Sequence, residues 1–351
     1  MKIFTILLIL VCPIASTGFF VGCDVQMSQD LTPPESGQSI EDYLASQNFI
    51  GSILVEKSGN ILISKGFGYA DFETKEKNTA YTKFRIGSIT KLFTSLGILI
   101  LEEEGLLSIE HPISRYLEGF PNGGNITVKH LLTHTSGIRD YTSPLRKKAN
   151  EEISSDQLVM WIAKLRPEFK PGKRFSYSNS NYVLLGRIIE VISGQSYADY
   201  LHRRILRPSN MAETGYGSSI LGTEGNAIGY ENDYSRIKGP KMSFAFSSGA
   251  LSSTVADMQR FHNIFKNLTL LSASSIEKLY QVQIDNISLG WIVESKFYDR
   301  RAYWHGGKIS GFQSVFVRFP DNDAMIVILS NSQGSDVITL SNYVAGMVLN
   351  P

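Results

Sequence analysis

The chain has 351 residues, of which 42% are hydrophobic, so it can bury a substantial core in one large domain or two smaller ones. Lysine and arginine number 34, and aspartate and glutamate number 33, which gives a net charge of +1. A balance this close to zero gives no support for nucleic acid or an anionic membrane surface as a partner.

Residues 1–22 have the pattern of a secretory signal peptide. Lys2 is followed by about a dozen apolar residues and then by small ones, whereas a spanning helix needs roughly 20 apolar residues in a row. We therefore expect an exported protein of the periplasm or cell envelope. Both cysteines, Cys12 and Cys23, lie in or directly after this segment, so no disulfide is expected in the remainder.

The sequence VGC at residues 21–23 resembles a bacterial lipobox, although Phe20 stands where such motifs usually have leucine. Two interpretations stay open. Either Cys23 is lipidated and anchors the protein to the cell envelope, or the signal is simply cleaved. The polar residues 23–39 are typical of a tether, and residues 40–351 are expected to form one domain.

Hydrophobic patterning in this domain predicts an α+β fold. Residues 51–71 contain two strand-like runs around Ser-Gly-Asn, which indicates a hairpin. The apolar run 92–101 predicts a helix buried on nearly all sides, and an amphipathic helix is expected to end at Gly194. Three strand-like runs over 301–331 and a helix over about 335–349 follow. This order implies an antiparallel β-sheet built from both chain ends and flanked by helices, with a mainly helical insertion.

A lysine stands at the start of the buried helix, which is an unusual place for a charge. Lys91 follows Ser88 by three residues, so on a helix the amine and the hydroxyl share one face. A serine hydroxyl is a weak nucleophile until a neighbouring base takes its proton. A lysine enclosed by apolar groups loses its own proton more easily than one in water, so it can be that base or couple to another.

The same Ser-x-x-Lys pattern occurs twice more in the chain. Ser235 and Lys238 lie in a polar loop next to glycine and proline, and Lys278 of the third match stands beside Glu277, where a lysine can stay solvated. Only Lys91 opens a buried helix, so the surroundings rather than the pattern favour Ser88.

A second candidate element is the sequence YSN at residues 177–179, in a polar loop just before a helix. A tyrosine next to a lysine can serve as a general base, and an asparagine side chain can bind a substrate amide. The sequence YEN at residues 230–232 has the same form. For either stretch alone, a structural tyrosine with an asparagine cap is an equally good interpretation.

The third element is the sequence WHGG at residues 304–307, which leads into a strand-like run. Gly306 and Gly307 would let a ligand approach the strand edge closely. A bound peptide could pair with this edge, and the N–H groups of Lys308 and Ser88 could then face a carbonyl oxygen as oxyanion donors. A plain glycine turn is the alternative.

Together and in this order, the three elements resemble the serine β-lactamase and penicillin-binding protein superfamily, above all the class C β-lactamase-like group with its DD-peptidases and esterases. The separations of 89 residues from Ser88 to Tyr177 and of 128 from Tyr177 to His305 suit that group. So do the stretches VKHLLTHTSGI at 128–138 and SSGALSSTVADMQRF at 247–261. The resemblance covers roughly residues 40 to 345 and implies a β-lactamase/transpeptidase-like fold.

The resemblance also implies the roles of the site residues. Ser88 would be the nucleophile that forms an acyl-enzyme, and Lys91 and Tyr177 would share the proton transfer. Asn179 would help to hold the substrate amide, and residues 305–308 would bind the substrate along the strand edge.

One departure from the family pattern concerns the substrate carboxylate. His305 stands where many members have lysine, and Gly306 where many have threonine or serine. In place of a cation and a hydroxyl, this site would offer a titratable imidazole and no hydroxyl. Efficient β-lactam hydrolysis is therefore less expected than for a typical β-lactamase.

The predicted activity is that of a serine acyl hydrolase, with a D-alanyl-D-alanine carboxypeptidase acting on cell-wall peptides as the first candidate. An esterase on the same site comes second and a β-lactamase third; a penicillin-binding or sensor protein without turnover is the non-enzymatic alternative. The substrate would be a small peptide or ester. No cofactor is expected, and His130 and His134 lack the glutamate and third ligand of a zinc site.

Overall fold

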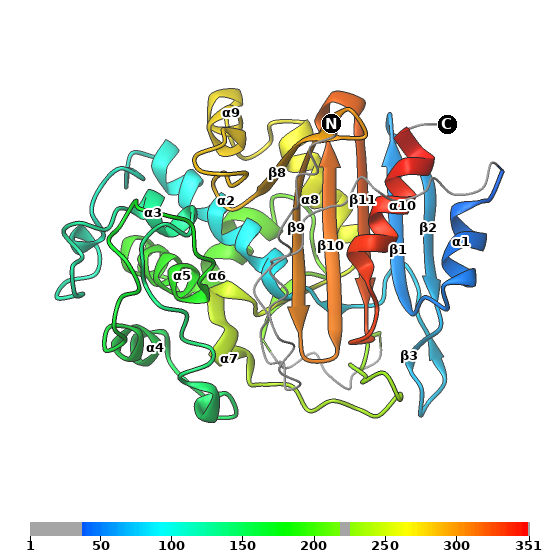
Figure 1. Cartoon of the computed structure of the whole chain (residues 1–351), viewed down its shortest axis with the longest axis horizontal. Coiled ribbons are helices and arrows are strands. Elements are labelled where there is room, and N and C mark those ends of the chain that lie inside the picture. The colour runs from blue at the N-terminus through cyan, green and yellow to red at the C-terminus, as the bar shows by residue number, and fades with distance from the viewer. Residues whose placement is uncertain (1–36, 218–224, 350–351) are drawn as a thin grey trace, which may run out of the picture.

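The computed structural model describes residues 37–217 and 225–349. Its centre is a six-stranded sheet with the strand order β2-β1-β11-β10-β9-β8, in which all neighbours are antiparallel. Because β1 pairs with β11, the two ends of the chain meet in the middle of the sheet, which confirms the predicted architecture (Figure 1). The strands are β1 Gly51–Lys57, β2 Asn60–Phe67, β8 Ile292–Phe297, β9 Arg300–Ile309, β10 Phe312–Phe319 and β11 Ala324–Ser330.

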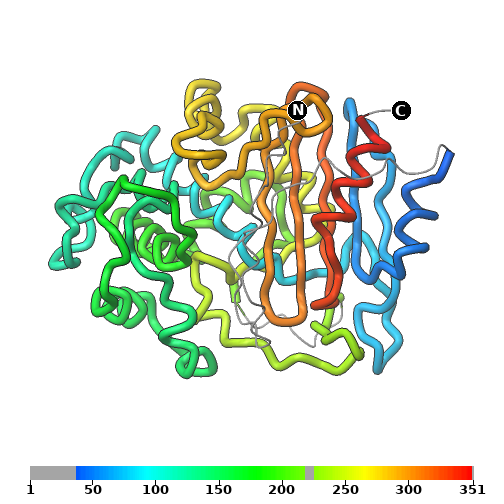
Figure 2. The backbone as a smooth tube through the Cα atoms, in the orientation of Figure 1, coloured from blue at the N-terminus to red at the C-terminus, as the bar shows by residue number. Residues whose placement is uncertain are grey.

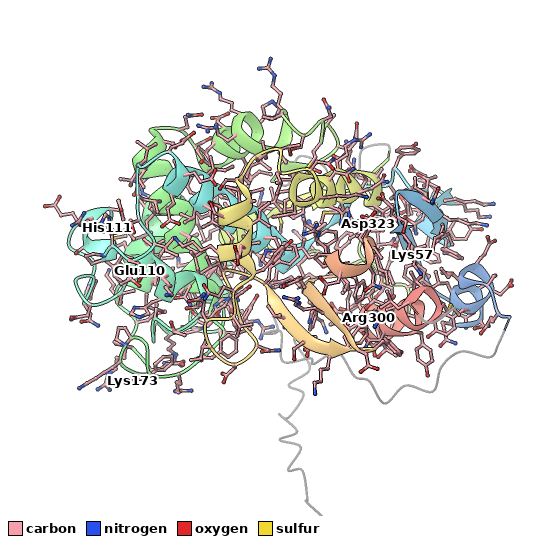
Figure 3. The ribbon with its side chains drawn as sticks, turned by 90° about the horizontal axis from the view of Figure 1, so that it is seen from above. Lys57, Glu110, His111, Lys173, Arg300 and Asp323 are labelled. Atoms are coloured by element: carbon pink, nitrogen blue, oxygen red, sulfur yellow. The ribbon has the colours of Figure 1, made fainter. Side chains whose placement is uncertain are left out.

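A mainly helical insertion separates β2 from β8, as predicted. It contains α2 Thr90–Glu103, α3 Val128–Leu132, α4 Ser155–Ile162, α5 Asn179–Ser193, α6 Tyr197–Leu201, α7 Met242–Ala245, α8 Val255–Lys266 and α9 Ala273–Tyr280. Two small sheets lie within it. In one, β3 Tyr69–Asp71 pairs with β4 Glu76–Lys77; in the other, β7 Leu251–Ser253 lies between β5 Phe84–Arg85 and β6 Gly215–Tyr216 and pairs with both. In Figure 3, Glu110 and His111 mark the insertion's end of the molecule, opposite Lys57 on β1.

Helices cover both faces of the sheet. The terminal helices α1 Ile40–Ser46 and α10 Val337–Leu349 pack on one face, and α8 packs on the other (Figure 1). Along β11 the side chains alternate between the two hydrophobic clusters: Met325 and Val327 belong to one, and Ile326 and Ile328 to the other. Because both faces are covered, every residue of β11 is buried, which explains its continuous apolar sequence.

One strand of the sheet is absent from the sequence-based prediction. Three strands were expected over 301–331, but β8 precedes them and pairs with β9. The turn between these two strands consists of Tyr298 and Asp299, both with positive φ angles of 48° and 56°. Two-residue turns of this kind usually carry Asn-Gly or Asp-Gly, so this turn lacks the expected sequence signal.

Helix α2 packs on α5 and lies between the sheet and the helices α4 and α5 (Figure 2). All residues from Thr90 to Leu101 are buried, so the predicted buried helix is present and Lys91 is enclosed with it. A short 3₁₀ turn, Gly87–Ile89, leads from β5 into this helix. Ser88 therefore stands at the point where a strand becomes a helix.

The 3₁₀ turn packs directly against β9. Gly87 has a φ of 49°, and a Cβ atom there would lie 3.0 Å from the backbone nitrogen of Lys308. At Gly307, a Cβ atom would overlap the carbonyl oxygen of Ile86. Both glycines are thus needed for the close approach that brings Ser88 next to the strand.

No helix among the described residues is long and apolar enough to span a membrane. The signal peptide over 1–22 and Cys23 lie outside the described residues, and these assignments stay predictions, as does the tether over 23–39.

Replacing Gly307 by alanine should separate β9 from the turn that carries Ser88. The new methyl group has no room, so we expect a loss of about 1–3 kcal/mol in unfolding free energy and a much lower rate of acylation of Ser88. Gly124→Ala is the control, since a Cβ atom there meets nothing within 4 Å. Denaturant unfolding and labelling by a fluorophosphonate measure both effects. If Gly307→Ala and Gly124→Ala have the same free energy of unfolding and the same rate of labelling, the tight packing at Gly307 is contradicted.

Candidate active site

Ser88 lies where the three predicted elements meet. Its side chain is nearly buried, with 8% exposure. The Ser88 Oγ accepts a hydrogen bond from Lys91 Nζ at 3.0 Å and another from Tyr177 Oη at 2.8 Å. The fold thus brings together a hydroxyl, an amine and a phenol that lie up to 89 residues apart in sequence.

Lys91 is fully buried and hydrogen-bonded to three acceptors. Besides Ser88 Oγ, its Nζ donates to Asn179 Oδ1 at 2.8 Å and to the carbonyl oxygen of Ser248 at 2.7 Å. An ammonium group has three N–H donors, and these contacts provide an acceptor for each. The rings of Tyr177 and Tyr182, with centroids 5.0 and 5.5 Å from Nζ, add the attraction of their faces for a cation.

Asn179 begins α5 and is held by Asp140, a residue that the sequence analysis missed. Both the backbone N–H and the Nδ2 group of Asn179 donate to Asp140 Oδ2, at 2.6 and 2.9 Å. This contact directs the Oδ1 atom of Asn179 towards Lys91. Because Nδ2 carries a second N–H, the predicted contact of Asn179 with a substrate amide stays a prediction.

His134 supports Tyr177 from the side. The two rings stack with centroids 4.5 Å apart. His134 Nδ1 accepts hydrogen bonds from the backbone N–H of Ser178 and from Asn181 Nδ2, so the ring proton is on Nε2. Burial, followed by the nearby charge of Lys91, lowers the pKa of His134 well below its ordinary value.

The histidine pair of residues 130 and 134 has separate structural roles. His130 Nδ1 accepts a hydrogen bond from the backbone N–H of Thr127 and closes the N-terminus of α3, whereas His134 packs on Tyr177. Within residues 37–217 and 225–349, no group of three or more histidine, cysteine, aspartate or glutamate side chains could hold a metal ion.

His305 is buried and electrically neutral near neutral pH. Its Nδ1 lies 2.6 Å from the carbonyl oxygen of Gly306, and a carbonyl can only accept, so the proton is on Nδ1. Burial, with a smaller effect of the charge on Lys91, lowers the pKa of His305 from 6.5 to about 3. The Nε2 atom is therefore left as an acceptor.

The strand edge at residues 305–308 is open on the side away from β10. Pairing of β9 with β8 reaches only to Trp304, while pairing with β10 continues to Ile309. Since side chains alternate along a strand, His305 and Gly307 face the 3₁₀ turn and Lys308 points to the opposite face. Lys308 can therefore offer its backbone N–H to the site, but its ammonium group points away.

The competing sequence matches are structural. Lys278 forms an ion pair with Glu102 at 2.7 Å, and Lys238 is exposed. Tyr230 donates a hydrogen bond to Asp71 at 3.0 Å, and its backbone forms a β-bridge with Arg236. Burial of Lys91 is the feature that separates the site from these matches, as the sequence analysis expected.

A cavity of about 370 Å³ begins beside the site. Tyr177 and His305 line it together with His134, Phe175 and the segment 285–295 that leads into β8. A buried serine with a lysine and a tyrosine at its oxygen, next to an open strand edge and a cavity, is the arrangement expected of a serine acyl-transfer enzyme.

Comparisons with known proteins place the chain in a family. A family model described as Beta-lactamase matches residues 38–345. The chain is 30% identical over 320 residues to the Bacillus subtilis protein named "Putative penicillin-binding protein PbpX", with 90% of this chain and 79% of that protein covered. This chain belongs to the β-lactamase family, whose members are serine hydrolases.

Two solved structures of related proteins have the same fold as this chain. The octameric penicillin-binding protein homologue from Pyrococcus abyssi is 28% identical with a TM-score of 0.79, covering 88% of this chain and 76% of that one. FmtA from Staphylococcus aureus is 28% identical with a TM-score of 0.77, covering 89% and 86%. These likenesses confirm the predicted β-lactamase/transpeptidase-like fold.

Replacing Lys91 should slow acylation of Ser88 by about 10³-fold or more, since a hydrogen-bonded proton carrier is removed. Lys91→Gln keeps a donor for Asn179 and Ser248, so this variant should fold, and the rate of fluorophosphonate labelling reports the loss. Lys278→Gln changes a lysine of the same sequence pattern and should label at the unchanged rate. Undiminished labelling of folded Lys91→Gln would make this lysine purely structural.

The buried imidazoles predict a loss of stability in mild acid. Burial lowers the pKa values of His262 and His305 from 6.5 to about 3. Between these values the unfolded chain binds more protons than the folded one, so the free energy of unfolding falls as the pH drops from about 6.5 towards 3. The slope is up to about 1.4 kcal/mol per pH unit for each imidazole.

Denaturant unfolding at pH 5 and pH 7 measures this dependence. His305→Gln should reduce the slope of unfolding free energy against pH by up to about 1.4 kcal/mol per pH unit, which corresponds to one proton. His202→Gln, at an exposed position, should leave the slope unchanged. An unaltered slope in His305→Gln would show that His305 is not held neutral by burial.

Proposed function

We propose that this chain hydrolyses amide or ester bonds in acyl compounds of D-amino acids through a covalent acyl-enzyme on Ser88. The observation that carries the proposal is the pair of hydrogen bonds that Ser88 Oγ receives from Lys91 Nζ and Tyr177 Oη. The name of the Bacillus relative, which refers to penicillin binding, supports a serine that is open to acylation. The D-alanyl-D-alanine carboxypeptidase expected from the sequence is one member of this substrate class.

In the first step, Ser88 Oγ attacks the carbonyl carbon of the substrate. For this step Lys91 Nζ or Tyr177 Oη must first lose a proton, so that its hydrogen bond with Ser88 reverses; the Ser88 O–H then donates to that atom and transfers its proton to it. Both carriers can take this proton, because Nζ and Oη lie 3.0 and 2.8 Å from the same Ser88 Oγ.

The negative charge that forms on the substrate oxygen needs donors that are already in place. The backbone N–H groups of Ser88 and Lys308 come from segments in close contact, since a Cβ atom on Gly87 would lie 3.0 Å from the Lys308 nitrogen. Fixed donors of this kind stabilise an oxyanion without reorganisation. We assign them as the oxyanion hole.

Collapse of this intermediate breaks the bond to the leaving group. The leaving nitrogen or oxygen takes the proton from Tyr177 or Lys91, and the acyl group stays on Ser88 Oγ as an ester. Water then attacks this ester and gives its proton to one of the same carriers. As the bond between the acyl carbon and Oγ breaks, the carrier returns a proton to Ser88 Oγ and the acid product leaves.

A second candidate is ester hydrolysis as the main activity. Gly306 brings no hydroxyl, and His305 is neutral with an acceptor at Nε2, so the usual cation and hydroxyl for a substrate carboxylate are missing at these two positions. An ester substrate does not need them, and an alcohol leaves more easily than an amine.

Turnover measurements test the proposed function. Purified protein is incubated with p-nitrophenyl butyrate and with diacetyl-L-lysyl-D-alanyl-D-alanine in its acid and amide forms, and adduct mass and product release are followed. We expect turnover of the ester and of at least one peptide form, and a loss of about 10⁴-fold or more in Ser88→Ala. The proposal would be contradicted if none of the three substrates acylates the protein, or if Ser88→Ala turns them over as fast as the unmodified protein.

A further inference from the structure

The cavity next to the site lies on the side from which a leaving group would depart. Tyr177 and His305 are part of its lining, whereas Ser88 is not. Tyr177 Oη is 2.8 Å from Ser88 Oγ, so one side of this tyrosine contacts the nucleophile and the other borders the cavity. A group that takes a proton from Tyr177 as it leaves therefore enters this space.

The side chains that can carry a charge in the cavity at neutral pH are acidic. Asp285 and Glu294 contribute carboxyl groups, and no lysine or arginine of the described chain lines the cavity. The two lining imidazoles, His134 and His305, do not supply a positive charge, because burial keeps both neutral near neutral pH.

Glu294 is built into this wall rather than free on the surface. It is half-buried on β8, and its Oε1 accepts a hydrogen bond of 3.4 Å from Asn286 Nδ2, another lining residue. Burial raises the pKa of Glu294 above its ordinary value, so this carboxyl is partly removed from water. A second negative charge placed nearby would be screened equally poorly.

We infer that this cavity is a leaving-group subsite that selects against a carboxylate, so that the preferred substrate ends in an amide or ester rather than a free acid. The inference rests on the proposed function and specifies its substrate class. A terminal carboxylate would meet like charges at Asp285 and Glu294 and an acceptor at His305 Nε2. A terminal amide has N–H groups, and these can donate to the same atoms.

A matched pair of peptides tests the inference. Diacetyl-L-lysyl-D-alanyl-D-alanine and its C-terminal amide share the acyl part and the scissile bond, and differ only in the charge of the leaving group. We expect kcat/KM to be at least about tenfold higher for the amide, the size of effect that one unit charge at about 10 Å produces at low effective dielectric. Release of D-alanine and of D-alaninamide gives the two rates.

The variants Asp285→Asn and Glu294→Gln, alone and combined, test the cause. Both keep side-chain size and one acceptor oxygen and remove the charge, so we expect kcat/KM for the acid to rise about tenfold in the double variant, with the amide rate unchanged. Glu118→Gln is the control, because Glu118 is exposed and outside the cavity.

The outcomes separate this inference from the proposed function. If neither peptide nor p-nitrophenyl butyrate acylates the protein, the proposed function fails. If both peptides are cleaved and the acid is cleaved as fast as the amide or faster, or the double variant leaves their ratio unchanged, the proposed function stands and the leaving-group subsite is wrong.

Discussion

The buried ammonium group of Lys91 is the constraint on which the site depends. Removing a charge of this kind from water is costly unless hydrogen bonds replace those to the solvent. Here an asparagine, a serine hydroxyl and a backbone carbonyl, from three separate segments, accept its three N–H donors. Each acceptor must be held in place, and much of the surrounding structure does so: Asp140 fixes Asn179, and the turn after α7 presents the carbonyl of Ser248.

The fold explains how distant segments reach one place. Pairing of β1 with β11 joins the chain ends, and in the insertion α5 packs on α2, whose preceding 3₁₀ turn contacts β9 and β10. Gly87 and Gly307 then allow the turn before α2 to touch β9. Ser88 with Lys91, Tyr177, and the open strand edge thus come from three regions of the sequence, and the same packing encloses Lys91.

Sequence patterns predicted the parts of the site that have strong local signals. Lys91 in an apolar helix and the glycines of β9 are features of this kind, and the resemblance joined them to Tyr177. Asp140 was missed because an aspartate in a polar loop has no signal of its own; its importance comes from a contact with a residue 39 positions away. The strand β8 was missed because its turn uses Tyr298 and Asp299 instead of glycine or asparagine.

The charges of the site residues could be assigned only from the structure. A histidine at position 305 could be charged or neutral by sequence alone. Burial makes it neutral, and the bond to the carbonyl of Gly306 places its proton on Nδ1, which leaves Nε2 as an acceptor. The acidic groups of the segment before and within β8 are ordinary surface residues in the sequence, and only the fold places Asp285 and Glu294 beside Tyr177. Substrate selection is therefore the property least visible in the sequence.

The most direct test of this account locates the nucleophile. The protein is labelled with a fluorophosphonate, digested, and the modified peptide is sequenced by mass spectrometry, which compares Ser88 with Ser235 and Ser275 of the same Ser-x-x-Lys pattern in one sample. Since only Ser88 has a buried lysine and a tyrosine at its hydroxyl, we predict that the label is found on Ser88 and is lost in Ser88→Ala. A label on another serine, or one that persists in Ser88→Ala, would contradict the account.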